Sequence, residues 1–379
     1  MKSNAILVPG LAAFASAAKH HLITGTFSGS YLYALEFDDV AETLTLTSNL
    51  TAAGPHPWIS LSHDKKALYA TDDGSWHSYS VSHSNGSSPS LQHSASVPIT
   101  GDCQSDRGIY IIGGNAPPYN VYADPFGDCA NVVSVESSTG ALSAVAQNVS
   151  YTSGSSGVHG LALHPSGKYL YSADDSGNAV WTHAINNGTG LLELVSKTDA
   201  PTTGANPRHA AVHPLGGYLY VVLEESNELA QYRIDAKSGK PVFDNVTFPL
   251  IADGLDTSLY WSDDVAVSPS GCFLYASSRA RETNSTGYIS AYELSSDGRI
   301  AQQLLLQPTT TSGGSANALA AAPWADSYVA LTDTQERFVQ IWKLERNATS
   351  AGGMAVEAKV VGRVDVEDGG CCANAVWLD

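Results

Sequence analysis

The chain has 379 residues, of which 43% are hydrophobic, and 19 basic against 37 acidic residues give a formal net charge of −18. This apolar content supports a large buried core and excludes a disordered chain. The acidic excess argues against nucleic acid or an anionic membrane as a partner, because both require clustered Lys and Arg. Gly, Ser, Thr, Val and Tyr are plentiful whereas Lys, Glu and Arg are scarce, which favours an all-β fold over exposed helices.

Residues 1–18 predict a secretory signal peptide. Lys2 supplies a positive charge, Ala5 to Ala13 is largely apolar, and Ala15-Ser16-Ala17 has the small-residue spacing of a signal-peptidase site. The apolar run is too short to span a bilayer, and a merely ragged apolar N-terminus is the alternative. We therefore expect residues 19–379 to form a single secreted or cell-surface domain.

Asn-x-Ser/Thr sequons independently favour export. Seven of them are spread along the whole chain, none has Pro in the middle, and most adjoin Gly, Ser or Thr clusters that are typical of loops. Such motifs are acceptors for N-linked glycans on surface loops of exported proteins. The predicted glycosylation sites are Asn49, Asn85, Asn148, Asn187, Asn245, Asn284 and Asn347.

The five cysteines indicate one disulfide. Cys103 and Cys129 each follow an Asp in a loop-rich region and are candidates to pair in an oxidising compartment. Cys371 and Cys372 are adjacent, and we expect them not to bridge to each other, because neighbouring cysteines do so only with strain. The odd count leaves at least one thiol free, and no cysteine spacing fits a zinc site, so no structural metal is predicted.

A hairpin motif recurs along the chain. Each copy is a short apolar run, a polar turn that often holds Pro and Gly, and a second β-rich run that in most copies ends in Tyr. The three clearest copies are residues 160–171, 210–220 and 265–275. The two weaker copies are residues 59–69 and 319–330.

The spacing of these copies predicts a seven-bladed β-propeller. The double gap between 69 and 171 holds one further unit around residues 107–110, and another unit must precede residue 60. Seven units of roughly 50 residues with four strands each are the pattern of a propeller. The lone β-rich segment 373–377 is expected to join the N-terminal strands in one blade and so to close the ring.

Four polar residues flank the predicted strands where the blades meet the channel mouth. His159 precedes an inner run, Arg208 has the same place one unit later, and Glu224 and Arg279 end second runs. Two guanidiniums favour a dicarboxylate or tricarboxylate, because Arg binds carboxylates with a planar fork. His and Glu are natural proton donors and acceptors. The alternative is that Glu224 and the two Arg residues only pair with one another between blades.

Other polar residues favour structural roles. The pairs Asp174-Asp175 and Asp263-Asp264 are possible cation ligands, but such pairs more often cap turns, so no metal site is predicted. His164 and His213 lie in the His-Pro turn of the repeat and are expected to be structural.

Four short motifs resemble those of the fungal 3-carboxy-cis,cis-muconate lactonizing enzymes (carboxymuconate cyclases): Gly157-Val-His-Gly160, Asn206-Pro-Arg208, Leu223-Glu224 and Ala276-Ser-Ser-Arg279. These enzymes belong to the lactonase family of seven-bladed propellers, which also holds 6-phosphogluconolactonase-like proteins. The likeness extends from about residue 20 to the C-terminus.

This resemblance implies an activity and assigns roles. His159 and Glu224 would be catalytic, and Arg208 and Arg279 would bind substrate carboxylates. The implied reaction uses no metal or organic cofactor: a carboxylate oxygen of a muconate adds across a conjugated C=C bond, and His159 or Glu224 delivers a proton to carbon. The expected partner is therefore a small carboxylated substrate or a lactone.

Two other functions stay open. The export signals are compatible with a non-catalytic, adhesin-like glycoprotein, or with a changed substrate, since aromatic-acid catabolism is intracellular. A sugar-lactone hydrolase is the third hypothesis; it would need a positioned water or a metal, for which the paired Asp residues are the only hint.

Overall fold

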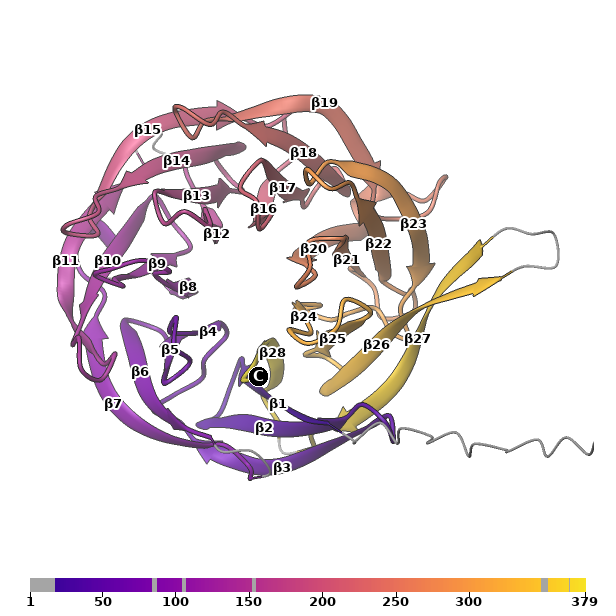
Figure 1. Cartoon of the computed structure of the whole chain (residues 1–379), viewed down its shortest axis with the longest axis horizontal. Helices are drawn as coiled ribbons and strands as arrows, with labels where there is room; N and C mark the ends of the chain where they lie inside the picture. The colour runs from indigo at the N-terminus through magenta and orange to yellow at the C-terminus, as the bar shows by residue number, and fades with distance from the viewer. Residues whose placement is uncertain (1–17, 84–86, 104–106, 152–154, 349–353, 368) are drawn as a thin grey trace, which may run out of the picture.

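Seven antiparallel sheets of four strands each surround a central axis in the computed structural model, which Figure 1 shows in a view down the ring. The structure describes residues 18–83, 87–103, 107–151, 155–348, 354–367 and 369–379. This architecture confirms the predicted all-β, seven-bladed β-propeller with four-stranded blades. Within the described ranges, no helix is long and apolar enough to cross a bilayer.

Each blade runs from an innermost strand at the channel to an outermost strand at the rim, and the blades are numbered here in chain order. The strands, from inside to outside, are β28 (Cys371–Trp377), β1 (Lys19–Thr26), β2 (Tyr31–Asp38) and β3 (Thr43–Thr51) in blade 1; β4 (Ile59–Leu61), β5 (Ala67–Thr71), β6 (Ser75–Ser82) and β7 (Ser90–Pro98) in blade 2; β8 (Gly108–Gly113), β9 (Val121–Pro125), β10 (Cys129–Val135) and β11 (Leu142–Ser150) in blade 3; β12 (Val158–Leu163), β13 (Tyr169–Asp174), β14 (Ala179–Ile185) and β15 (Leu192–Asp199) in blade 4; β16 (Pro207–Val212), β17 (Tyr218–Leu223), β18 (Glu228–Ile234) and β19 (Pro241–Pro249) in blade 5; β20 (Tyr260–Val267), β21 (Phe273–Ala280), β22 (Tyr288–Leu294) and β23 (Ile300–Pro308) in blade 6; and β24 (Leu319–Ala321), β25 (Tyr328–Asp333), β26 (Phe338–Ala348) and β27 (Met354–Asp365) in blade 7. Two short 3-10 helices are η1 (Gly101–Cys103) and η2 (Thr257–Leu259).

In four blades, the tyrosine that ends the repeated hairpin motif joins the blade to the next one. Its ring is buried between sheets, and its hydroxyl group donates to a backbone carbonyl in a turn of the following blade. The donor and acceptor pairs are Tyr69 with Gly140, Tyr171 with Gly239, Tyr220 with Gly298, and Tyr275 with Asp326. The repeat therefore preserves contacts between blades as well as the hairpin itself.

The predicted structural histidines lie in the inner turns. His164 Nε2 contacts the carbonyl of Gly216 at 3.0 Å, and His213 Nε2 contacts that of Gly271 at 3.1 Å. Each contact joins one blade to the next, which agrees with the structural role expected for the His-Pro turn.

The first and last parts of the chain share blade 1. Strand β28 pairs antiparallel with β1, with Leu22 opposite Trp377 and Thr24 opposite Ala375. This confirms that segment 373–377 joins the N-terminal strands, and Figure 1 shows β28 at the channel side of that blade. Because β1 pairs with β28 on one side and β2 on the other, neither edge of the N-terminal strand is left unpaired.

A β-bulge interrupts the innermost strand near its start in blades 4, 5 and 6, and β8 of blade 3 has a similar register shift between Gly108 and Tyr110. The register shifts between Val158 and Gly160 in β12, between Pro207 and Ala210 in β16, and between Ser262 and Val265 in β20. A bulge breaks the alternation of side chains and re-aims the residues within it. In all three strands these residues face the same end of the channel, which becomes the site described below.

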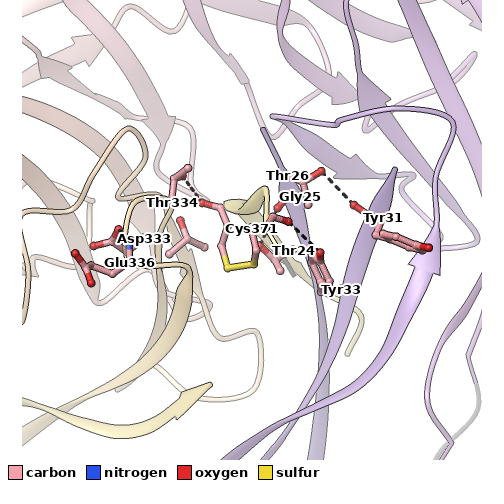
Figure 2. The surroundings of a disulfide bond; sticks show 12 residues. Thr24, Gly25, Thr26, Tyr31, Tyr33, Asp333, Thr334, Glu336 and Cys371 are labelled. Carbon is pink, nitrogen blue, oxygen red and sulfur yellow. Dashed lines mark hydrogen bonds between the residues drawn. A yellow bond between two sulfur atoms is a disulfide. The ribbon is translucent and has the colours of Figure 1, made fainter. Parts of the chain in front are cut away.

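Two disulfides occur among the described residues, one predicted and one not. Cys103 and Cys129 are bonded, as expected. Cys371 and Cys372 are also bonded to each other, so the expectation that they would not bridge was wrong: their peptide bond is cis and their Cα atoms are 3.0 Å apart. Figure 2 shows this bond between β1 and the end of β25, where the hydroxyl of Thr334 donates to the carbonyl of Cys372 at 2.5 Å. Cys272 is the free, exposed cysteine.

Removing the Cys103–Cys129 bond should destabilise the protein. The bond closes a segment with a sequence separation of 26 and anchors η1 to β10, so its loss frees the unfolded chain. We expect the Cys103→Ser, Cys129→Ser double variant to lose about 2–4 kcal/mol of unfolding free energy in urea titrations. A midpoint equal to that of the wild type would contradict this expectation.

The predicted export features are only partly covered by the structure. The predicted signal peptide lies outside the described residues apart from residue 18, and so does Asn85. The other six sequon asparagines are all exposed: Asn49, Asn148, Asn187, Asn245, Asn284 and Asn347. A glycan could reach each of these six side chains without unfolding the blade that carries it.

Candidate active site

A cavity of about 160 Å³ lies at the end of the channel where the innermost strands begin. Its lining comes from, or leads into, each of the seven blades: Phe27, Pro57, Trp58, Ile109, His159, Arg208, Asp263, Arg279, Ser315, Ala316, Ala318 and Asn374. This volume is below the lower end of about 300 Å³ for sites that hold drug-sized ligands. The cavity therefore suits a small molecule, and the three bulges supply most of its charge.

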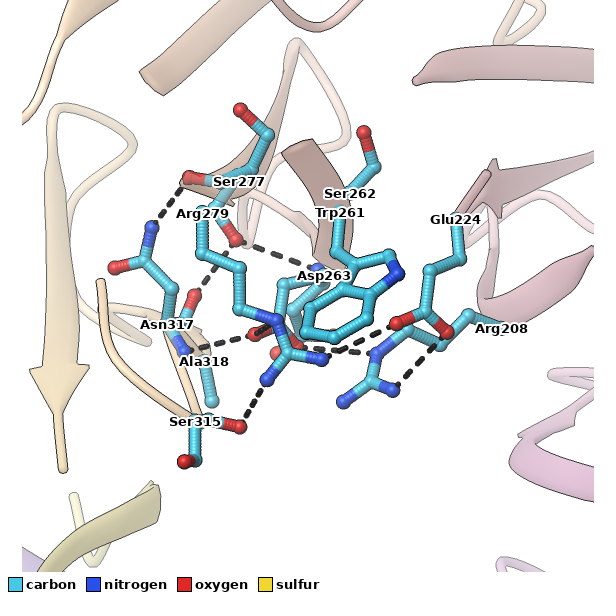
Figure 3. Close-up of polar contacts among 12 residues, drawn as sticks. Arg208, Glu224, Trp261, Ser262, Asp263, Ser277, Arg279, Ser315, Asn317 and Ala318 are labelled. Carbon is cyan, nitrogen blue, oxygen red and sulfur yellow. Dashed lines mark hydrogen bonds and ion pairs between the residues drawn. The ribbon is translucent and has the colours of Figure 1, made fainter. Parts of the chain in front are cut away.

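Glu224 connects the two predicted arginines. Its Oε1 accepts from Arg279 Nη2 at 3.1 Å, and its Oε2 accepts from Arg208 Nη1 at 3.4 Å, as Figure 3 shows. All three side chains are buried. Because Arg208 and Arg279 also line the cavity, the structure combines the two possibilities raised by the sequence: the residues pair between blades, and they face a shared site.

Asp263 is a second carboxylate between the same two arginines. Its Oδ1 accepts from Arg208 Nε at 3.3 Å, and its Oδ2 lies 3.6 Å from Arg279 Nε. Burial alone would raise the pKa of Asp263, but the two guanidiniums outweigh burial and lower this pKa to about 2. Asp263 is therefore an anion at neutral pH, and it holds both guanidiniums beside the cavity.

Asp175 adds a carboxyl group with a raised pKa. Burial, the negative charge of Glu224 and a hydrogen bond to Glu224 raise the pKa of Asp175 to about 8. Asp175 is therefore mostly protonated at neutral pH. This proton is next to Arg208, whose charge partly offsets the effect.

His159 is a hydrogen-bond acceptor toward the cavity side. Its Nε2 lies 2.7 Å from Arg208 Nη1, and a guanidinium only donates, so this nitrogen carries a lone pair. Burial first, and then the charge of Arg208, lower the pKa of His159 well below its usual range. The imidazole is thus neutral in this arrangement and has no proton on the nitrogen that faces Arg208.

A rim ion pair supports Arg279 from outside. The Trp261 ring lies 5.2 Å from the Arg279 guanidinium and 3.9 Å from that of Arg281. Trp261 Nε1 donates to Glu225 at 2.8 Å, and Arg281 pairs with the same carboxylate at 2.7 Å. This stack limits where the Arg279 side chain can move.

The paired aspartates are occupied by the protein itself. Asp174 accepts from the backbone N–H of Gly157 and Gly177 at 2.8 Å each and from Trp181 Nε1 at 2.8 Å, so it holds a turn. In the described part of the chain, no group of three or more His, Cys, Asp or Glu side chains is placed to hold a metal ion.

Sequence reasoning missed Asp175 and Asp263 as members of the site. Asp263 has the same place before its His-Pro-like turn as His159 and Arg208 have before theirs, so aligning the repeats would have found it. Asp175 gives no such signal, because its role comes from a contact with Glu224 in the next blade.

Comparison with known proteins agrees with this architecture. The family model described as lactonase, 7-bladed beta-propeller, matches residues 21–340. A carboxy-cis,cis-muconate cyclase of Neurospora crassa is 36% identical over 95% of this chain and 99% of its own length. The muconate cycloisomerase 1 of Cutaneotrichosporon cutaneum is 30% identical over 85% of this chain and 90% of its own. Among solved structures, a periplasmic gluconolactonase of Pseudomonas aeruginosa superposes with a TM-score of 0.75 at 16% identity, covering 95% and 99% of the two chains.

Proposed function

The chain belongs to the lactonase family of seven-bladed β-propellers, and from this premise we propose that it lactonizes a small muconate-type carboxylate. The observation that carries the proposal is the placement of Arg208 and Arg279 on one small cavity, with Glu224 between them and Asp175, whose pKa is raised, beside Glu224. Two cations select a substrate with more than one carboxylate, and the carboxyl group of Asp175 supplies an acid.

The reaction needs no external nucleophile, because both reacting groups belong to the substrate. An oxygen of one carboxylate forms a C–O bond to a diene carbon. The π electron pair of that double bond moves to the neighbouring carbon, which is conjugated to the second carboxylate and then takes a proton. Each turnover of an ionised muconate thus consumes one proton from solvent. Arg208 and Arg279 would hold the carboxylates and stabilise the enolate-like charge that develops.

Asp175, beside Glu224, is a better proton donor than His159. His159 presents a lone pair to Arg208, and its lowered pKa leaves it neutral. The pKa of Asp175 is raised to about 8, close to the operating range, which favours proton transfer. His159 then acts as the partner that orients Arg208.

The deciding experiment is a lactonization assay on the purified protein. Loss of the ultraviolet absorbance of 3-carboxy-cis,cis-muconate, with uptake of one proton per turnover, is the expected result. Unsubstituted cis,cis-muconate and a panel of sugar lactones should be tested beside it. Turnover of sugar lactones alone would contradict the proposal and favour the sugar-lactone hydrolase. Absence of any turnover would favour the non-catalytic glycoprotein.

The rate should depend on pH through the carboxyl pair. Since the acid form donates the proton and the pKa of Asp175 is raised to about 8, kcat for lactonization should fall as pH rises through about 8. Asp175→Asn removes this acid, so kcat at pH 7 should fall about 100-fold. Glu225→Gln, at the next position and outside the pair, is the control. An unchanged alkaline limb in Asp175→Asn would disprove this assignment.

We also propose that the protein is exported and glycosylated. The six exposed sequon asparagines and the two disulfides support this, because both modifications are typical of the secretory route. Expression in a fungal host should yield secreted protein whose mass falls on treatment with an N-glycosidase. Recovery of only unmodified protein inside the cells would contradict the proposal.

A further inference from the structure

A chain of four buried side chains leads from the substrate cavity into the protein. Arg208 Nη1 contacts His159 Nε2 at 2.7 Å, His159 Nδ1 contacts His209 Nε2 at 3.1 Å, and His209 Nδ1 contacts Asp264 Oδ1 at 3.1 Å. Their exposed fractions are 7%, 8%, 1% and 6%. The last two residues take no part in the proposed chemistry, yet they are as deeply buried as those that do.

The two end residues, Asp264 and Arg208, fix the direction of every hydrogen bond in this series of side chains. The carboxylate of Asp264 accepts the backbone N–H of Val265 at 2.8 Å and of Leu319 at 2.9 Å, so each of its oxygens is an acceptor. His209 must therefore donate from Nδ1 and accept at Nε2. His159 donates from Nδ1 in turn, which leaves its Nε2 as the lone pair that Arg208 requires.

The surroundings of His209 hold it in this position. Its ring centroid is 4.8 Å from that of Trp58 and 5.5 Å from that of Tyr110, while the absence of a side chain at Gly160 makes room for it. A Cβ atom at Gly160 would lie 2.6 Å from His209 Cδ2. This packing leaves the imidazole little freedom to turn and reverse its hydrogen bonds.

We propose that His209 and Asp264 are positioning residues that keep His159 in its Nδ1–H tautomer, so that Arg208 stays turned toward the substrate cavity. The identity of the substrate in this inference rests on the proposed function. The tautomer of His159 does not depend on it. With the opposite tautomer, His159 would present an N–H to the N–H groups of Arg208, and the guanidinium would be driven from its place.

The test compares His209→Ala with His213→Ala. His213 is also a buried histidine that bridges to the next blade, but it follows the other end of β16 and contacts Gly271. His209→Gln is the conservative variant, because its amide oxygen accepts from His159 and its NH2 group donates to Asp264. Binding is measured with adipate, a saturated dicarboxylate that cannot lactonize, and the His159 tautomer is read from the side-chain 15N shifts.

We expect His209→Ala to bind adipate about 10- to 100-fold more weakly and to raise KM similarly, with kcat little changed. His209→Gln should restore both the affinity and the 15N pattern, and His213→Ala should resemble the wild type. Equal affinity in His209→Ala and His213→Ala would overturn the proposal. A loss confined to kcat would also overturn the proposal, because the four side chains would then conduct protons rather than position Arg208. If the wild type binds adipate with the expected tautomer but lactonizes nothing, the positioning role stands and only the proposed function fails.

Discussion

Replacing Arg279 with alanine is expected to lower kcat/KM for muconate lactonization by about 1,000-fold while the protein remains folded. Arg279 contributes a guanidinium to the cavity wall, and it also holds Glu224 at 3.1 Å. Its loss removes one carboxylate partner in the bound substrate and one cation beside the developing enolate, effects that are each large in a dry site. Initial rates from the ultraviolet assay measure the change.

Arg281 provides the matched control for this variant. It lies two residues further along, is partly exposed and pairs with Glu225 at 2.7 Å, but it does not line the cavity. Arg281→Ala should therefore retain kcat/KM within a few-fold. If Arg279→Ala keeps wild-type turnover, or if both variants lose activity equally, the assignment of Arg279 to substrate binding is wrong. Arg279→Lys should recover only part of the loss, because an ammonium does not present a planar fork.

Replacing Asp263 with asparagine should destabilise the protein by about 3–5 kcal/mol, because two buried guanidiniums then lose their shared anion. The pKa of Asp263 is lowered to about 2, so its contribution to stability is present above its unfolded pKa of about 4 and is lost as pH falls toward 2. Urea titrations at pH 7 and below pH 4 measure both effects, and Asp263→Asn should show less acid destabilisation than the wild type.

Glu225→Gln again supplies the comparison, since it removes a carboxylate from a partly exposed pair. The free energy of unfolding should fall by less than about 1 kcal/mol there. Comparable losses of unfolding free energy in Asp263→Asn and Glu225→Gln would mean that the buried ion pairs of Asp263 stabilise the protein no more than the partly exposed pair of Glu225. In that case the cluster is held mainly by the packing of β16 and β20.

The repeat carried most of the information about the fold. A Tyr at the end of each clear hairpin copy predicts equivalent positions, and in the structure the hydroxyls of Tyr171, Tyr220 and Tyr275 each donate to a turn of the following blade. The ring closure was also predictable, because segment 373–377 had no hairpin partner of its own. The disulfide between Cys371 and Cys372 was not predicted, because the adjacency of the two cysteines argued against it.

The candidate site was predictable in part, for a physical reason. His159 and Arg208 precede equivalent turns, so their placement at one channel end follows from the propeller alone. The bulges that turn them into the cavity do not follow, because a bulge depends on the pairing register. The raised pKa of Asp175 requires two blades to bring this carboxyl group next to Glu224, which neither residue indicates by itself.

The shared blade 1 has a consequence for biosynthesis. Thr24 in β1 and Asn374 in β28 are in contact although they are 350 residues apart, and Asn374 also bonds to Ile59 in blade 2 and lines the cavity. A ribosome therefore completes all other strands before it produces β28, and β1 has an uncovered edge throughout elongation. The ring can close only after β28 has been translated, in whichever compartment then holds the chain, and chaperones there would meet an open ring.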